Sequence, residues 1–206
     1  MSAVGEAFIK AIGKPDPSAN NGVRFSRPSF HAAWSALQPE VGAGWYLNRF
    51  LYLFGEELAA LEPCLDAWSF LVPPNPDRMI VGRNAYGMLL VVENASTAGA
   101  DRVFVLDPTQ VVYWTEPDLG WGNLLGYWMA NRKIPGFFDT GLYDTWVKEN
   151  DAYPEVEDIL GLKAPLPLGG KLETSNVQLE NIIEYYQSTA PVYAKALEQL
   201  KSKRGS

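Results

Sequence analysis

The chain has 206 residues, of which 47% are hydrophobic and 20% are charged, so it is long and apolar enough to bury a core as one globular domain. Its longest apolar runs are about five residues, which excludes a membrane span, and its net charge of −7 argues against nucleic acid as a direct ligand. A single cysteine excludes an internal disulfide, and the first residues lack the pattern of a secretory signal. We therefore expect a cytoplasmic protein with no membrane partner.

The N-terminal part of the chain, to about residue 40, predicts a helical segment. Apolar side chains recur every four residues in 3–12, a spacing typical of one face of a short helix. Ser29 is placed to cap a second helix, which Pro39 ends. A strand is then predicted at 48–54, because the run NRFLYLF is rich in aromatic and apolar residues and a glycine follows it.

The stretch 80–114 predicts an antiparallel meander. It holds three short apolar runs, at 88–92, 103–106 and 111–114, which are joined by short polar segments. The runs are apolar at nearly every position, so we expect both faces of the sheet to be covered, with helices on at least one side. Gly87 is expected to allow a tight entry into the first of these strands.

The C-terminal part, about 123–201, predicts the helices that cover this sheet. Apolar residues recur at helical spacing in 123–132 and again in 138–150. A last helix is predicted from residue 177 to about 201, split or kinked by Pro191. Together these elements predict a single α+β domain spanning 1–206, with a central, mostly antiparallel sheet flanked by helices.

The residues needed for catalysis or for holding a cofactor are scarce. His31 is the only histidine and Cys64 the only cysteine, so the common metal clusters and the Ser-His-Asp arrangement lack parts. The glycines of 120–126 have the wrong spacing for a dinucleotide loop, and no phosphate loop exists. We expect no enzymatic activity and no metal, nucleotide or redox cofactor. Paired carboxylates such as Glu116 and Asp118 leave open a carboxylate-dependent enzyme.

The negative charge is concentrated in one segment. Residues 139–158 contain seven acids against Lys148 alone, and the predicted helix at 138–150 places several of these acids on its outer side. A second patch is expected where two tryptophans flank the acidic loop after the meander, because tryptophan is enriched at interface hot spots. The candidate partner-contact residues are Asp139, Asp144, Glu149, Asp151, Glu155, Glu116, Asp118, Trp114 and Trp121.

Six stretches, in this order, carry a family resemblance: NRFLYLF with GEEL (48–58), WSFL (68–71), GRNAYGMLLVVEN (82–94), RVFVLDP (102–108), LLGYWMANR (124–132) and LPLGGKLETSN (166–176). The sequence resembles the bacterial GAD-like immunity proteins, which accompany type VI secretion toxins, and is distantly similar to the SUKH immunity superfamily. The resemblance covers roughly residues 25–190, with Asn84, Tyr86-Gly87 and Gly169-Gly170 as anchors. It implies an α+β fold with a central antiparallel sheet, no enzymatic activity, and binding of a cognate toxin, often a nuclease, inside the producing cell.

Two classes of function stay open. The first is an immunity protein, or antitoxin, whose clustered acids imitate the nucleic acid that a basic nuclease expects. The second is a small enzyme or a domain that binds a ligand other than a nucleotide, with a pocket near Glu116, Asp118, Trp114 and Trp121. A neighbouring toxin gene would favour the first, and a deep pocket with converging polar groups would favour the second.

Overall fold

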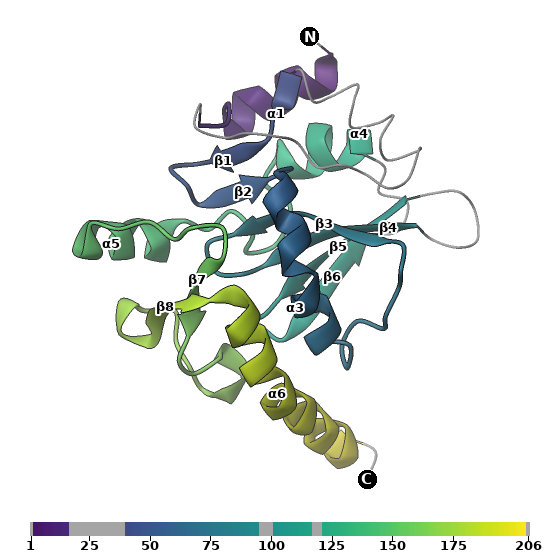
Figure 1. The fold of residues 1–206 in the computed structure, drawn as a ribbon, viewed down its shortest axis with the longest axis vertical. Helices are drawn as coiled ribbons and strands as arrows, with labels where there is room; N and C mark the ends of the chain where they lie inside the picture. The colour runs from purple at the N-terminus through teal and green to yellow at the C-terminus, as the bar shows by residue number, and fades with distance from the viewer. Residues whose placement is uncertain (1, 17–39, 95–100, 117–120, 205–206) are drawn as a thin grey trace.

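A six-stranded antiparallel sheet forms the centre of the protein, in a computed structural model that describes residues 2–16, 40–94, 101–116 and 121–204. Each strand pairs with its neighbour in sequence, which confirms the predicted meander and the α+β class (Figure 1). The strands are β1 (Gly44–Tyr46), β2 (Leu51–Leu53), β3 (Arg78–Asn84), β4 (Leu89–Asn94), β5 (Asp101–Asp107) and β6 (Val112–Glu116).

The predicted strand at 48–54 is shorter in the structure, and the first long strand of the meander was missed. Only Leu51–Leu53 is extended, because Leu47, Asn48 and Arg49 form a left-handed turn with φ values of 52°, 55° and 63°. Left-handed backbone cannot continue a strand. The prediction also did not include β3, whose short apolar run at 79–81 is followed by Gly82 and the polar Arg83 and Asn84.

Both faces of the sheet are buried, as its nearly continuous apolar runs predict. Leu90 on β4 pairs with Val105 on β5, and both side chains belong to the hydrophobic cluster on the first face. Their neighbours Leu89 and Leu106 also pair, and these point to the cluster on the second face. Because successive side chains of a strand point to opposite faces, two cores are built from one set of strands.

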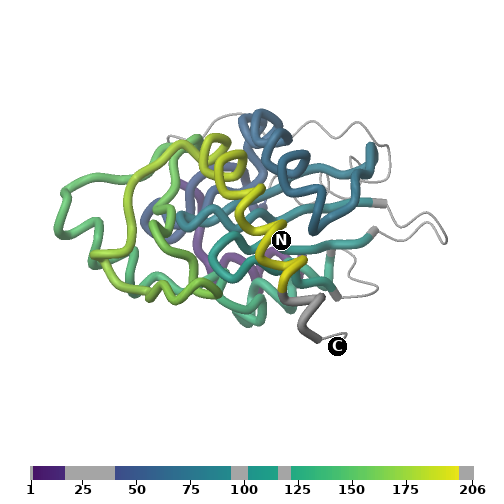
Figure 2. Tube along the Cα trace, turned by 90° about the horizontal axis from the view of Figure 1, so that it is seen from below, coloured from purple at the N-terminus to yellow at the C-terminus, as the bar shows by residue number. Residues whose placement is uncertain are grey.

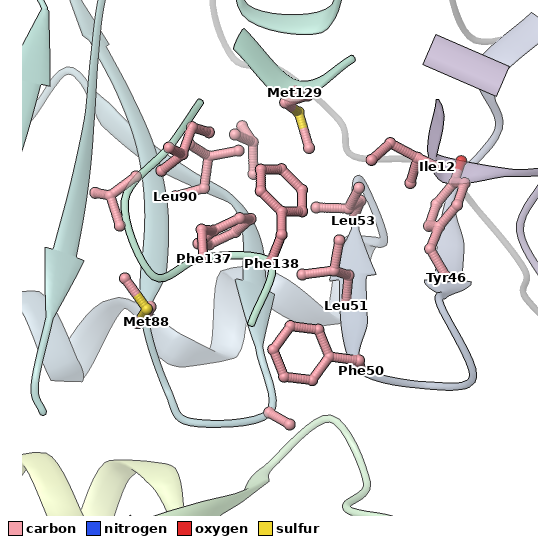
Figure 3. Close-up of a cluster of buried hydrophobic side chains, with 14 of the residues drawn as sticks. Ile12, Tyr46, Phe50, Leu51, Leu53, Met88, Leu90, Met129, Phe137 and Phe138 are labelled. Atoms are coloured by element: carbon pink, nitrogen blue, oxygen red, sulfur yellow. The ribbon is translucent and has the colours of Figure 1, made fainter. Parts of the chain in front are cut away.

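The first face is covered by the N-terminal helix and by helices from the segment 121–150. These are α1 (Ala3–Ile12), the short α4 (Trp121–Asn123), the π-helix η2 (Leu124–Met129) that continues it, and α5 (Gly141–Asn150). α1 is confirmed as predicted, with the Ser2 hydroxyl accepting a hydrogen bond from the Gly5 N–H at its start. Figure 3 shows Ile12 and Met129 from this layer close to Leu53 of β2, and Phe137 and Phe138 beside Leu90.

The second face is covered by the 3-10 helix η1 (Glu56–Leu61), α3 (Glu62–Ala67) and the long α6 (Ile182–Arg204). α3 and α6 lie side by side, as Figure 2 shows. Trp68, which is fully buried, joins them: its indole N–H donates to the carbonyl of Tyr186 on α6 at 3.0 Å. The covering of this face therefore depends on segments more than a hundred residues apart.

The predicted C-terminal helix starts too early, because its first five residues form a strand. This strand, β8 (Val177–Asn181), pairs with β7 (Asp158–Leu162) in a separate two-stranded sheet. That helix begins only at Ile182, because β7 supplies a pairing partner for the preceding five residues. The Asn181 side chain then accepts from the N–H groups of Ile183 and Glu184, which starts the helix. Pro191 lies inside α6 without ending it. Two short 3-10 turns, Leu166–Leu168 and Thr174–Asn176, connect β7 to β8.

Two further helix predictions differ in detail. The helix predicted at 123–132 is mainly the π-helix Leu124–Met129, and the one predicted at 138–150 starts at Gly141, whose N–H is held by the Asp139 carboxylate at 3.2 Å. The predicted helix beginning near Ser29 lies outside the described residues, as does His31.

Gly87, in the β3–β4 turn, has a positive φ of 79°, as its predicted role requires. An added Cβ would lie 3.1 Å from the Cδ1 of Ile159, so Gly87→Val combines backbone strain with crowding. We expect it to lower the free energy of unfolding by about 2 to 3 kcal/mol. The matched control is Gly169→Val, at φ 89° with no atom within 4 Å of the added Cβ, which suffers strain alone. Chemical denaturation of both variants measures the difference, and equal losses would contradict the crowding.

Candidate partner-binding surface

α5 is fixed to the sheet through Tyr143, which is fully buried. Its backbone N–H donates to the Tyr86 hydroxyl at 2.9 Å, and its own hydroxyl donates to the carbonyl of Asn48 at 2.7 Å. The Tyr143 ring meets Phe50 edge to face, with ring centroids 5.2 Å apart. Trp146, one turn further, is also buried. The inner side of α5 is therefore held by both packing and hydrogen bonds.

The outer side of α5 and the turns next to it present the predicted acids. Asp144 and Glu149 are exposed on the helix itself. Asp139 is exposed just before the helix, and Asp151 ends it in a left-handed conformation. Glu155 is exposed beyond that turn and pairs with Arg49 at 2.6 Å. The structure thus brings these five acids to one helix and its flanking turns, here called the α5 acidic face.

The second predicted patch is described only in part. Trp114 is half-buried and packs against Trp128, with ring centroids 5.1 Å apart. Glu116 ends β6 and pairs with Val103 of β5, which in turn pairs with Val92 of β4. These residues lie at one end of the sheet. The β3–β4 turn, which holds α5 through Tyr86, lies at the other end. The backbone of Glu116 therefore lies away from the α5 acidic face. Asp118 and the side chains of Glu116 and Trp121 lie outside the described residues.

A cluster of cations and aromatic rings, which the sequence did not predict, lies beside this face. The guanidinium groups of Arg49 and Arg83 each lie 5.1 Å from the ring centre of Trp45, and Arg49 also lies 5.6 Å from the ring of Tyr153. Such contacts bring cations over aromatic rings, where the ring quadrupole attracts them. The one signal in the sequence was an arginine close after the apolar run at 79–81, at a position that only tertiary structure places beside Trp45.

Arg83 is completely buried and bridges two segments. Its guanidinium donates to its neighbour's carbonyl, that of Asn84, at 3.2 Å and to the carbonyl of Glu155. Burial lowers the pKa of Arg83 to about 10, an effect that the carboxylates of Asp158 and Glu157 partly oppose. The side chain therefore stays charged at neutral pH and ties the chain after α5 to β3.

An open recess of about 520 Å³ adjoins this cluster. It is lined by residues 14–16, by residues 45–49 and by Tyr153. The left-handed turn at Leu47–Arg49 shapes one wall, and its Asn48 carbonyl is the group that holds Tyr143 of α5. The recess therefore lies next to the anchored side of the α5 acidic face.

Other chemistry is limited within the described part of the chain. Those residues contain no group of three or more His, Cys, Asp or Glu side chains arranged to hold a metal ion. Cys64 is fully buried, and burial raises the pKa of its thiol to about 12, so the thiol is protonated at neutral pH. In that same part of the chain, no helix has both the length and the apolar character that crossing a membrane requires.

Comparison with known proteins gives information on the fold only. No protein-family model matches the chain, and no curated protein matches it. The chain is similar in structure to Atu4351 from Agrobacterium tumefaciens, with a TM-score of 0.55 and 13% sequence identity. The match covers 93% of this chain and 88% of that one. At this identity the likeness shows a shared α+β arrangement across nearly the whole chain.

Proposed function

We propose that this chain is an immunity protein that binds and neutralises a cognate secreted bacterial toxin, a basic nuclease of the type VI secretion kind. The observation that carries the proposal is the α5 acidic face, in which Asp144 and Glu149 point outward from a helix anchored by Tyr143. The sequence resemblance to GAD-like immunity proteins points to the same function.

The physical reason is electrostatic complementarity. A nuclease that binds phosphates presents lysine and arginine in its active site, and fixed carboxylates on a rigid helix offer it the same sign of charge as its substrate. Complementary charge raises the rate of association more than it raises the affinity of the final complex. Because the inner side of α5 is buried in the core, the helix backbone that carries these acids loses little further conformational freedom on binding.

The cluster beside α5 adds contacts of a different kind. Tyr153 is 39% exposed, and Arg49 lies over its ring at the mouth of the recess. Tyrosine and arginine are enriched among residues that contribute most of the binding energy at protein interfaces. We infer that the interface extends from the α5 acidic face to Tyr153, with the acids guiding the approach and the aromatic side chain holding the complex.

The test is a charge reversal, Asp144→Lys with Glu149→Lys, assayed with the product of the adjacent gene as the candidate toxin. We expect the association rate at low salt to fall about tenfold and its dependence on salt to weaken. Stability should change by less than about 0.5 kcal/mol for each site, because both side chains are exposed. Binding kinetics at two ionic strengths provide the measurement.

The matched control reverses two exposed acids on α6, Glu184→Lys with Glu198→Lys. It changes the net charge by the same amount on a helix that runs away from α5 (Figure 1). If both double variants slow association equally, the effect comes from net charge and the α5 acidic face is not the interface. If neither changes the rate, the toxin binds elsewhere on the protein.

A further inference from the structure

The last strand of the sheet has an open edge. β6 pairs with β5, and among the described strands none pairs with its other side. Two of its apolar side chains, Val112 and Tyr113, are 46% and 47% exposed. The unpaired backbone groups of an edge strand are a template on which another extended chain can add.

A groove of about 430 Å³ runs beside this edge. Met88 and Val105 belong to the core beneath it, and Pro135 and Gly136 come from the segment that leads to α5. Val112 and Trp114 of β6 contribute side chains from the same face of the sheet as Val105. The groove is thus mainly apolar, and its volume is large enough for a side chain of a strand placed next to β6.

One charged group, Asp107, lines the groove. Its Oδ1 accepts three hydrogen bonds, from the Thr109 N–H at 2.8 Å, the Thr109 hydroxyl at 2.7 Å and the Gln110 N–H at 3.3 Å. The other oxygen, Oδ2, has no hydrogen-bond partner among the described residues, and it is not among their fully buried unpaired atoms. The carboxylate is therefore held in one orientation with one oxygen left to accept from a ligand.

The lining of the groove contains no lysine or arginine, so the negative charge of Asp107 meets no cation there. A lysine or arginine side chain matches such a site, because its apolar stem packs against aliphatic and aromatic walls while its charged end reaches a carboxylate. A second copy of this chain pairing through β6 does not supply that cation, since residues 112–116 read VYWTE.

We propose that the open edge of β6 and the adjoining groove bind an extended segment of a protein partner, whose backbone adds as a seventh strand and whose lysine or arginine side chain pairs with Asp107. The site goes beyond the proposed function, because it recognises a strand with a basic residue whether or not a toxin uses the α5 acidic face. Its test needs no toxin, so the two proposals succeed or fail separately.

The probe is the capped peptide acetyl-TVTKTVT-amide, compared with the same peptide carrying norleucine in place of lysine. Backbone amide shifts of the labelled protein report where each peptide binds. We expect shifts concentrated in β6, β5 and the turn between them, and about tenfold tighter binding of the lysine peptide. A third peptide, with alternate backbone amides N-methylated, keeps the side chains but blocks strand pairing, and we expect it not to bind.

Asp107→Asn is the decisive variant, because an asparagine Oδ1 still accepts the three hydrogen bonds of the turn while the charge is lost. We expect it to remove the preference for lysine over norleucine, and Glu198→Gln on α6, which lies outside both proposed sites, to leave that preference unchanged. If Asp107→Asn does not fold, Val112→Lys places a repelling cation at the groove with Asp107 intact and should weaken the lysine peptide alone. Shifts located elsewhere, a preference that survives either variant, or equal binding of the N-methylated peptide would overturn the proposal.

Discussion

Trp68→Ala is expected to lower the free energy of unfolding by about 4 kcal/mol, because it removes a fully buried indole from the centre of the second core. The ring contacts Tyr186 and Tyr193 of α6 at centroid distances of 5.0 and 5.4 Å, and Phe70 at 5.4 Å. The substitution also leaves the Tyr186 carbonyl without its indole donor. A domain is typically stable by about 5 to 15 kcal/mol, so this loss is a large share of the total.

Trp68→Phe separates the two parts of that effect. Phenylalanine keeps an aromatic ring in the site but removes the N–H that donates to Tyr186, so we expect a smaller loss of about 1 to 2 kcal/mol. Urea denaturation followed by far-ultraviolet circular dichroism measures both variants. An alanine variant within about 1 kcal/mol of the unmodified protein would show that α6 is not held to the sheet through Trp68.

Arg83→Ala is expected to cost about 3 kcal/mol, the second largest loss. Arg83 fills a fully buried position, lies over Trp45, and donates to the Glu155 carbonyl of the segment after α5. Alanine leaves a cavity and removes the bridge between β3 and that segment. We expect amide exchange around Glu155 to become faster in the variant, as a local sign that this bridge is lost.

Arg83→Met is the matched control, because methionine fills much of the same volume without charge or donors. Replacing a buried charge with an apolar side chain of similar size often costs little, so we expect a loss of less than about 1.5 kcal/mol. Chemical denaturation compares the two variants. Equal losses would mean that the hydrogen bonds of Arg83, and not its packing, hold the site together.

The sheet was predictable because its pairings are local. Each apolar run in 80–114 pairs with the next one along the chain, so strand pattern and turn residues were enough to order the strands. β8 was not predictable in this way, since its five residues adjoin a helix and its partner β7 lies about fifteen residues earlier. Without that partner, apolar residues at mixed spacing favour an extension of the helix.

The candidate surface was likewise predictable only where local spacing determines it. The outward position of Asp144 and Glu149 followed from helical spacing, because the apolar side of a helix turns toward the core. Whether the Glu116 loop lies on the same side as α5 could not be predicted, since sequence proximity cannot show which end of a sheet faces which helix. The position of Arg49 and Arg83 beside Trp45 depends on strand register and on a left-handed turn, and neither leaves a local signal.

Trp68 is synthesised well before α6, the helix that it contacts. The sheet is complete in the chain at Glu116, but α6 begins about sixty-five residues later, at Ile182. At translation rates of about 5 to 20 residues per second, the nascent sheet waits roughly 3 to 13 seconds for that cover. During this time Trp68 and the apolar residues around it are open to neighbouring chains. We therefore expect that ribosome stalling before Ile182 diverts the unfinished domain toward aggregation or chaperone binding.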